Sequence, residues 1–168
     1  HAEWLFAQFG TARIGAILVN INPAYQRSEL EYALNKVQCR VLIMARALKS
    51  SDYLAMVRAL APEIETAVPR LRAERLPRLR HVIVLDDGPL PPGAMRFADF
   101  LGAAGPAHRV RLEGLSAALD PDDAINIQFT SGTTGSPKGA TLSHFNIVNN
   151  ARSCAKAMAL GASDRLCI

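Results

Sequence analysis

The chain has 168 residues, of which 49% are hydrophobic and 20% are charged, and its formal net charge is +4. These proportions are ordinary for a globular domain and exclude a disordered or collagen-like chain. The longest apolar run, residues 14–21, is interrupted by Gly15 and Asn20 and is far too short to span a membrane.

The spacing of apolar residues alternates between helical and strand patterns along the chain. In the first part of the chain it predicts a helix over residues 3–15, a strand over 16–21, a helix from 28 through 37, a strand over 40–45 and a helix through 54–60. Further along it predicts a strand over 81–85, a short helix over 97–104 and a strand over 124–129. A brief extended piece at 140–142 and a long helix through 145–158 follow. Residues 63–80 are interrupted by prolines and give no clear pattern. The alternation predicts an α/β fold with a mostly parallel sheet and helices on both faces.

Polar residues mark where several of these helices begin. Ser28, with Glu31 three residues later, has the pattern of a capping box and predicts a helix start. The other expected helix boundaries are a cap at Ser51 or Asp52, a cap at Ser143 and a stop at Gly161.

Three aromatic residues and two acids invite functional interpretations that we do not favour. Trp4, Phe6 and Phe9 recur at near-helical spacing, so we expect them in a helix core rather than in a ligand pocket. Asp122 and Asp123 precede a strand, and a solvated turn is favoured over general acid catalysis.

The histidines and cysteines give no metal or disulfide pattern. His144 follows the cap of the last helix, where a solvent or capping contact is favoured over a ligand contact. His81 and His108 have no ligating neighbours in sequence, so no metal-binding residue is assigned. The cysteines are Cys39, Cys154 and Cys167. Their spacing predicts buried, reduced thiols in a cytoplasmic protein.

The basic residues are densest in one short segment, at Arg70, Arg72, Arg75, Arg78 and Arg80. A nucleic-acid-binding surface is one interpretation of such a cluster. No aromatic residue interleaves with these arginines, as a base-stacking platform would need. A solvated surface is therefore favoured, and no nucleic-acid partner is expected.

One segment has the composition of a phosphate-binding loop. It follows the strand expected over residues 124–129 and reads Thr130, Ser131, Gly132, Thr133, Thr134, Gly135, Ser136, Pro137, Lys138 and Gly139. The glycines permit positive φ and close approach to a ligand, and the hydroxyl and backbone N–H groups can donate to phosphate oxygens. Lys138 adds a positive charge. Ligands bind beyond the carboxyl ends of strands in open α/β sheets, which is where this segment lies.

Three other interpretations of this segment are disfavoured. A Walker A loop requires Gly-Lys-Ser/Thr, whereas Lys138 lies between Pro137 and Gly139, and Pro137 lacks an N–H. The dinucleotide fingerprint G-x-G-x-x-G is also absent. A mobile Gly/Ser/Thr linker fits poorly, because the segment is short, bounded by apolar structure and contains a lysine beside a proline.

Taken whole, residues 130–139 resemble the signature of the adenylate-forming superfamily, which contains acyl-CoA synthetases, luciferases and the adenylation domains of peptide synthetases. Residues 15–23 and 29–32 are similar to the early part of fatty acyl-CoA synthetases. Residues 124–129 and 142–150 look closest to the medium-chain type called acyl-CoA synthetase family member 2. The resemblance implies that the chain is part of the N-terminal, AMP-binding domain of such an enzyme, truncated at both ends and without the C-terminal domain.

The resemblance also implies a reaction and its ligands. A carboxylic acid, expected to be a medium- or long-chain fatty acid, attacks the α-phosphate of ATP to give acyl-AMP and pyrophosphate, and coenzyme A then displaces AMP. Thr130 to Lys138 would bind ATP, with Mg²⁺ as the companion ion. No catalytic residue is assigned, because a carboxylate nucleophile is already ionised at neutral pH. The chain alone is expected to be inactive. Amino-acid or aryl-acid adenylation, and a non-catalytic nucleotide-binding fragment, remain as alternatives.

Overall fold

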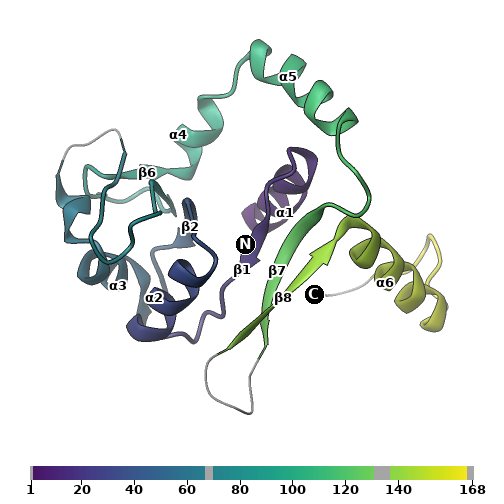
Figure 1. Ribbon diagram of the computed structural model, residues 1–168, viewed down its shortest axis with the longest axis horizontal. Coiled ribbons are helices and arrows are strands. Elements are labelled where there is room, and N and C mark those ends of the chain that lie inside the picture. Colours follow the sequence, from purple (N-terminus) through teal and green to yellow (C-terminus); the bar gives the residue numbers. More distant parts are fainter. Residues whose placement is uncertain (1, 67–69, 131–136, 166–168) are drawn as a thin grey trace. The chain divides into compact units, whose positions relative to one another are not determined.

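The computed structural model describes residues 2–66, 70–130 and 137–165, and the chain divides into two compact units (Figure 1). One unit contains residues 21–108, and the other contains residues 1–20 and 109–168. Strands and helices alternate in both, so the predicted α/β class is confirmed. No helix among the described residues has both the length and the apolarity needed to cross a lipid bilayer.

The unit of residues 21–108 is built on a three-stranded parallel sheet. Its strands are β2 (Val41–Ala45), β5 (His81–Leu85) and β6 (Ala94–Arg96), in the order β2-β5-β6. β2 and β5 pair along their whole length, from Val41 with His81 to Ala45 with Leu85. Both are nearly continuous apolar runs, as expected for strands covered on two faces. The sequence predicted β2 and β5 but not β6.

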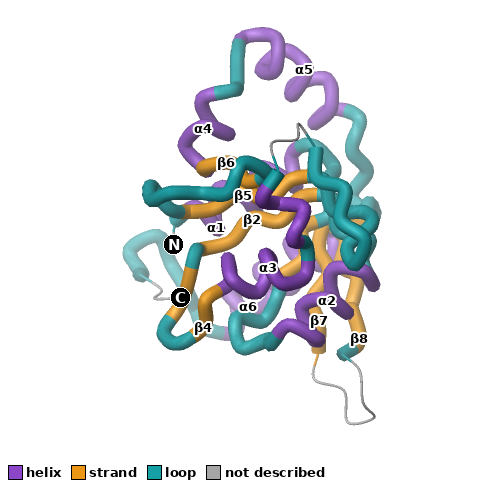
Figure 2. The backbone as a smooth tube through the Cα atoms, turned by 90° about the vertical axis from the view of Figure 1, so that its left-hand side faces the viewer, coloured by secondary structure: helices purple, strands orange, loops and turns teal. Residues whose placement is uncertain are grey.

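Helices lie on both sides of this sheet. They are α2 (Arg27–Lys36), α3 (Tyr53–Leu60) and α4 (Phe97–Gly102). Figures 1 and 2 show α4 on one side of the strands and α2 and α3 on the other. Val82 and Val84 belong to the core that contains side chains of α2 and α3, whereas strand alternation directs Ile83 to the opposite face. All three side chains are at most 2% exposed, so β5 is buried on both faces.

The beginnings of the helices in this unit correct one prediction and confirm another. The capping box of α2 is formed by Gln26 and Glu29, not by Ser28 and Glu31, and the Gln26 N–H donates to Glu29 Oε2 at 2.8 Å. The same three-residue spacing occurs twice here, and the extended backbone of Gln26 decides which pair caps. Asp52 caps α3 as expected, accepting a hydrogen bond from the backbone N–H of Ala55.

The described part of the segment between α3 and β5 contains a short 3₁₀ helix, η1 (Pro62–Glu65), and an irregular loop over residues 70–80. The loop buries four apolar side chains: Leu71, Ala73, Leu76 and Leu79. Its ends meet where the Leu71 N–H donates to the Arg80 carbonyl at 2.9 Å. Residues 71–80 therefore form an Ω-type loop, anchored to the core by its own side chains. A short antiparallel pair, β3 (Ala47–Leu48) and β4 (Ser51–Asp52), precedes α3.

The other unit contains a mixed three-stranded sheet in the order β1-β7-β8. β1 (Leu18–Asn20) is parallel to β7 (Ala124–Thr130), and β7 is antiparallel to β8 (Lys138–Ser143). The expected extended piece at residues 140–142 is thus part of a longer strand. The β7–β8 register shifts between Ala124 and Asn126, and this irregularity interrupts strict alternation, so Ile125 and Asn126 are both buried.

The helices of this unit are α1 (Glu3–Arg13) and α6 (His144–Ala157), and α5 (Pro106–Ala117) begins at the boundary. The sequence did not predict α5. α1 ends before Gly15, whose φ of +68° is left-handed and whose missing Cβ would lie 2.8 Å from Leu119 Cδ2, so only glycine fits without a shift. The indole N–H of Trp4 donates to Asn20 Oδ1 at 3.0 Å and ties α1 to β1.

The aromatic residues of α1 are not core residues, which corrects the prediction. Trp4, Phe6 and Phe9 are 47%, 61% and 66% exposed, and α6 likewise exposes Phe145 and Val148. The helical spacing correctly identified an apolar helix. It could not tell whether another element packs on that helix, and none of the described elements buries these rings.

α6 also ends earlier than predicted. Its last helical residue is Ala157, and Ala159, with a φ of 52°, takes the left-handed position that Gly161 was expected to supply. The Ala159 N–H donates to the Lys156 carbonyl and the Leu160 N–H to that of Ala155, which is the hydrogen-bond pattern of a Schellman motif.

Candidate functional site

The β7–β8 hairpin brings together the two ends of the predicted phosphate loop (Figure 1). Thr130 is paired with Lys138, and Phe129 with Gly139. The Thr130 hydroxyl donates to the Lys138 carbonyl at 3.3 Å across the pair. The loop therefore starts and finishes at one point of the sheet, beyond the carboxyl end of β7.

Three of the predicted ATP-binding residues lie within the described structure. Thr130 and Lys138 are exposed, and Pro137 is half-buried. The others lie outside the described residues: Ser131, Gly132, Thr133, Thr134, Gly135 and Ser136. An exposed ammonium beside an exposed hydroxyl suits an anion. The assignment of Thr130 to Lys138 as ATP ligands stays a prediction.

Gly139 serves packing rather than an unusual backbone conformation. Its φ is not positive, since Gly15 is the one described glycine in that region. A Cβ at Gly139 would lie 3.0 Å from Ile127 Cγ2 and 3.8 Å from the ring of Phe129. Glycine here lets β8 approach the side chains of β7 closely.

The start of α6, which follows the hairpin, is already capped. Ser143 Oγ accepts from the Asn146 N–H at 3.2 Å, and Asn146 Oδ1 accepts from the Ser143 N–H at 3.0 Å. The N–H groups of His144 and Phe145 donate to backbone carbonyls in the turn of residues 120–123, which precedes β7, at 3.3 and 2.8 Å. Ser143 is therefore the predicted cap, and these first N–H groups are already used within the protein rather than directed at a phosphate.

The turn of residues 120–123 confirms that Asp122 and Asp123 belong to a solvated turn. Asp123 Oδ2 accepts from the Asp120 N–H, and Asp120 Oδ1 accepts from the Asp122 N–H, both at 2.8 Å. All three residues are exposed. These carboxylates stabilise a solvated turn before β7 and are not arranged as a general acid.

Two buried polar atoms in this unit have no hydrogen-bond partner among the described residues. One is Nε2 of His144, a half-buried residue for which a solvent or capping contact of the ring stays a prediction. The other is Oδ1 of Asn126, whose side chain is 1% exposed. Asn126 was not singled out from the sequence, because β7 also contains Gln128 and the sequence does not show which of the two amides is buried. Buried polar atoms without a hydrogen-bond partner are rare in folded proteins.

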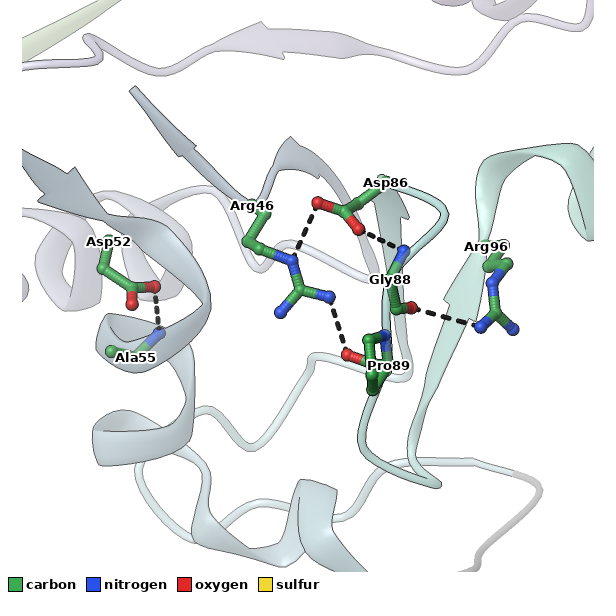
Figure 3. Close-up of polar contacts among 7 residues, drawn as sticks. All are labelled: Arg46, Asp52, Ala55, Asp86, Gly88, Pro89 and Arg96. Atoms are coloured by element: carbon green, nitrogen blue, oxygen red, sulfur yellow. Dashed lines mark hydrogen bonds and ion pairs between the residues drawn. The ribbon is translucent and has the colours of Figure 1, made fainter. Parts of the chain in front are cut away.

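A second polar cluster lies at the carboxyl ends of β2, β5 and β6 (Figure 3). Arg46 Nε donates to Asp86 Oδ2 at 2.8 Å, and Arg46 Nη2 donates to the Pro89 carbonyl at 2.6 Å. Arg96 Nη2 donates to the Gly88 carbonyl at 3.1 Å. The hydrogen bond from Arg46, with one from the Gly88 N–H, holds the pKa of Asp86 below its ordinary value. Both guanidinium groups are engaged with the turn, so the cluster supports that turn.

The cysteines differ in environment. Cys39 is half-buried and donates to the Val41 carbonyl at 3.2 Å, and burial raises the pKa of its thiol to about 11. Cys154 is exposed, so the prediction of burial is wrong for it. It lies on α6, a helix that buries none of its side chains. Cys167 lies outside the described residues.

Comparison with known proteins gives a consistent family. The model of the AMP-binding enzyme family matches residues 1–168. The protein named medium-chain acyl-CoA ligase ACSF2, mitochondrial, from Danio rerio is 51% identical over 150 residues, covering 89% of this chain and 24% of the relative. The putative acyl-CoA synthetase YngI of Bacillus subtilis is 42% identical over 168 residues, covering 99% of this chain and 30% of the relative.

A solved structure agrees. The anthranilate CoA ligase AuaEII, in complex with anthranoyl-AMP, superposes with a TM-score of 0.65 and 27% identity, over 90% of this chain and 25% of that one. The chain thus spans a quarter to a third of the length of these proteins.

Proposed function

The chain belongs to the AMP-binding enzyme family, and we propose that the full-length protein activates a carboxylic acid with ATP and transfers the acyl group to coenzyme A. In the first step the carboxylate attacks the α-phosphate of ATP, which forms acyl-AMP and releases pyrophosphate. In the second, the thiol of coenzyme A attacks the acyl carbon and AMP leaves. Residues 1–168 would be part of the N-terminal AMP-binding domain.

The observation that carries this proposal is the pairing of Thr130 with Lys138 at the end of the β7–β8 hairpin. It places a hydroxyl and an ammonium at the two ends of one Ser/Thr/Gly-rich segment. Positioned donors of this kind stabilise the negative charge that develops on a leaving pyrophosphate. The Thr130 hydroxyl already donates to the Lys138 carbonyl, so a phosphate oxygen would have to replace that bond.

The residues of the hairpin fit a triphosphate better than they fit a metal ion. β7 and β8 contain no carboxylate, and the described residues hold no cluster of three or more acidic, His or Cys side chains suited to a metal. Mg²⁺ would neutralise phosphate charge when bound with ATP. Thr130 and Lys138 would contact the phosphates directly.

A fatty acid of medium chain length is the proposed substrate. Its support is the 51% identity to the Danio rerio protein named a medium-chain acyl-CoA ligase. An aryl acid is the second candidate, supported by the similarity to an anthranilate CoA ligase at 27% identity. We propose a cytoplasmic location, whereas the Danio rerio relative is mitochondrial by name; fractionation of cells that make the full-length protein tests this.

The test is ATP–pyrophosphate exchange by the full-length protein, measured with fatty acids of increasing length and with anthranilate, with residues 1–168 alone run alongside. Exchange with an optimum at medium chain length supports the proposal. Exchange with anthranilate alone moves the substrate to the aryl acids. Absence of exchange with every acid, in a protein that still binds Mg-ATP, supports a non-catalytic nucleotide-binding role.

A further inference from the structure

The Ω-type loop of residues 71–80 borders an open hollow of about 520 Å³ in the unit of residues 21–108. Its charged lining consists of Arg70, Arg72, Arg80, Glu63 and Glu74. Pockets for small ligands fall in the range of about 300–1,000 Å³. The hollow is thus large enough for a small molecule, and it is distant in sequence from the predicted ATP loop.

The arginines around the hollow are not equally available. Arg75 forms a bidentate pair with Glu31, at 2.9 and 2.6 Å, and Arg80 Nη1 donates to the Leu79 carbonyl at 2.9 Å. Arg70 and Arg72 are exposed, and within the described part of the chain neither has a hydrogen bond or an ion pair. Two guanidinium groups with unused donors therefore face one hollow.

Neither acid of the lining forms an ion pair with Arg70 or Arg72 among the described residues. Glu63 is directed into the loop, where its Oε1 accepts from the Glu74 N–H at 3.0 Å and its Oε2 is enclosed. That carboxylate holds the loop in place. Glu74 is exposed and borders both this hollow and a second hollow with Arg75 and Arg78.

The backbone around Arg72 is anchored to the core. Leu71 and Ala73, on either side of Arg72, are 1% and 4% exposed, and Leu71 is hydrogen-bonded to Arg80. Arg72 therefore projects from a preformed position, which lowers the entropy lost on binding, and Arg70 directly precedes the anchored Leu71. A guanidinium matches the geometry of a phosphate by donating two parallel hydrogen bonds.

We propose that this hollow binds the phosphate group of a small soluble phosphate ester through Arg70 and Arg72. A small molecule is favoured over nucleic acid because none of the described residues that line the hollow has an aromatic side chain to stack a base. The proposal is independent of the activity proposed above.

The test is hydrogen–deuterium exchange, read peptide by peptide, on the full-length protein with inorganic phosphate or pyrophosphate as the probe. We expect slower exchange in the peptide covering residues 70–80, with the effect weakened by salt. The R70Q/R72Q variant should raise the probe concentration needed by about tenfold or more. Because the readout is local, pyrophosphate bound near Lys138 is recorded in a different peptide.

Two further variants keep the test decisive. R109Q/R111Q removes two exposed arginines with the same spacing in the other unit, and should leave the protection of residues 70–80 unchanged. R70K/R72K keeps the positive charge but loses the two parallel hydrogen bonds that a guanidinium donates. It should bind the probe more tightly than R70Q/R72Q and less tightly than the unmodified protein. Absence of protection, protection that survives in R70Q/R72Q, or protection by anionic lipid vesicles but by neither phosphate probe would each overturn the proposal.

Discussion

Arg46 and Asp86 join the carboxyl ends of two neighbouring parallel strands, with Arg46 Nε 2.8 Å from Asp86 Oδ2 (Figure 3). Arg46 follows β2 directly and Asp86 follows β5 directly. The same guanidinium also donates to the Pro89 carbonyl, so one side chain holds both strand ends and the turn that leaves β5.

The first prediction concerns the pH dependence of stability through Asp86. The pKa of Asp86 is lowered in the folded state, chiefly by the hydrogen bond from Arg46. Its contribution to stability is therefore present above the unfolded carboxyl pKa of about 3.9 and is lost as the pH falls through the lower folded value. We expect Asp86→Asn to lower the melting temperature at pH 7, and the difference from the unmodified chain to shrink below about pH 4.

A matched control is the pair of Arg58 and Glu65, which is also a single close contact, at 2.6 Å, but with side chains 45% and 51% exposed. Glu65→Gln should change the melting temperature less than Asp86→Asn, because it anchors no turn. Equal effects of the two substitutions, or an Asp86→Asn effect independent of pH, would contradict the role given to Arg46.

The second prediction concerns the core of the unit of residues 21–108. Leu60 is fully buried and lies in the cluster with Val57 and Ile64. Leu60→Ala should lower the free energy of unfolding by about 2–5 kcal/mol, because it removes apolar contacts and leaves a cavity. Leu101→Ala, at a position 51% exposed, should cost far less. Urea denaturation followed by circular dichroism measures both.

The third prediction concerns the end of α2. Gln38 has a φ of 52°, and the N–H groups of Gln38 and Cys39 donate to the carbonyls of Asn35 and Leu34, the same Schellman pattern that ends α6. A left-handed conformation costs a non-glycine residue about 1 kcal/mol. Gln38→Gly should therefore raise the free energy of unfolding by up to about 1 kcal/mol. Lys36→Gly, two residues earlier inside the helix, should lower it. A fall for Gln38→Gly would refute this account.

The fourth prediction separates the two described cysteines by reactivity. The thiolate is the reactive form, and burial raises the pKa of Cys39 to about 11, whereas Cys154 is exposed. At pH 8 iodoacetamide should modify Cys154 much faster than Cys39, and the Cys39 rate should still rise as the pH approaches 11. Peptide mapping by mass spectrometry gives each rate, with urea-unfolded chain as the reference in which the difference disappears.

The fifth prediction concerns Lys138. In the full-length protein Lys138→Ala should reduce ATP–pyrophosphate exchange by about 100-fold or more, since it removes a cation from the proposed phosphate site. Lys156→Ala removes an exposed cation from α6 and should leave exchange near its original rate. Equal exchange in the two variants would show that Lys138 does not contact the phosphates.

Strands and capped helices with strong local signals were predictable from the sequence. β5 was predicted with both ends correct, because its apolar run is bounded by polar residues at each side. The caps at Asp52 and Ser143 were also correct, since a short polar side chain before an apolar stretch satisfies the first N–H groups of a helix locally.

Features that depend on neighbours were not predictable in the same way. α5 buries no residue, so it has no apolar stripe to reveal it. The loop of residues 71–80 contains leucines and arginines at irregular spacing, without a helical or strand period, and only the core beneath it shows that the leucines anchor it. At the candidate site the sequence predicts that residues 130–138 bind ATP, and this stays a prediction. Asn126 and the enclosed nitrogen of His144 depend on packing that the sequence does not display.

The antiparallel pairing of β7 with β8 has a consequence for changes in chain length. Side chains alternate between the two faces of a strand, so inserting or deleting one residue in β8 while its docking to α6 is kept would transfer Lys138 to the opposite face of the sheet. A change of two residues would preserve the face but move the ammonium along β7 by about 7 Å. The six-residue length of β8, from Lys138 to the cap at Ser143, therefore determines on which face of the sheet the Lys138 ammonium lies and how far along β7 it lies.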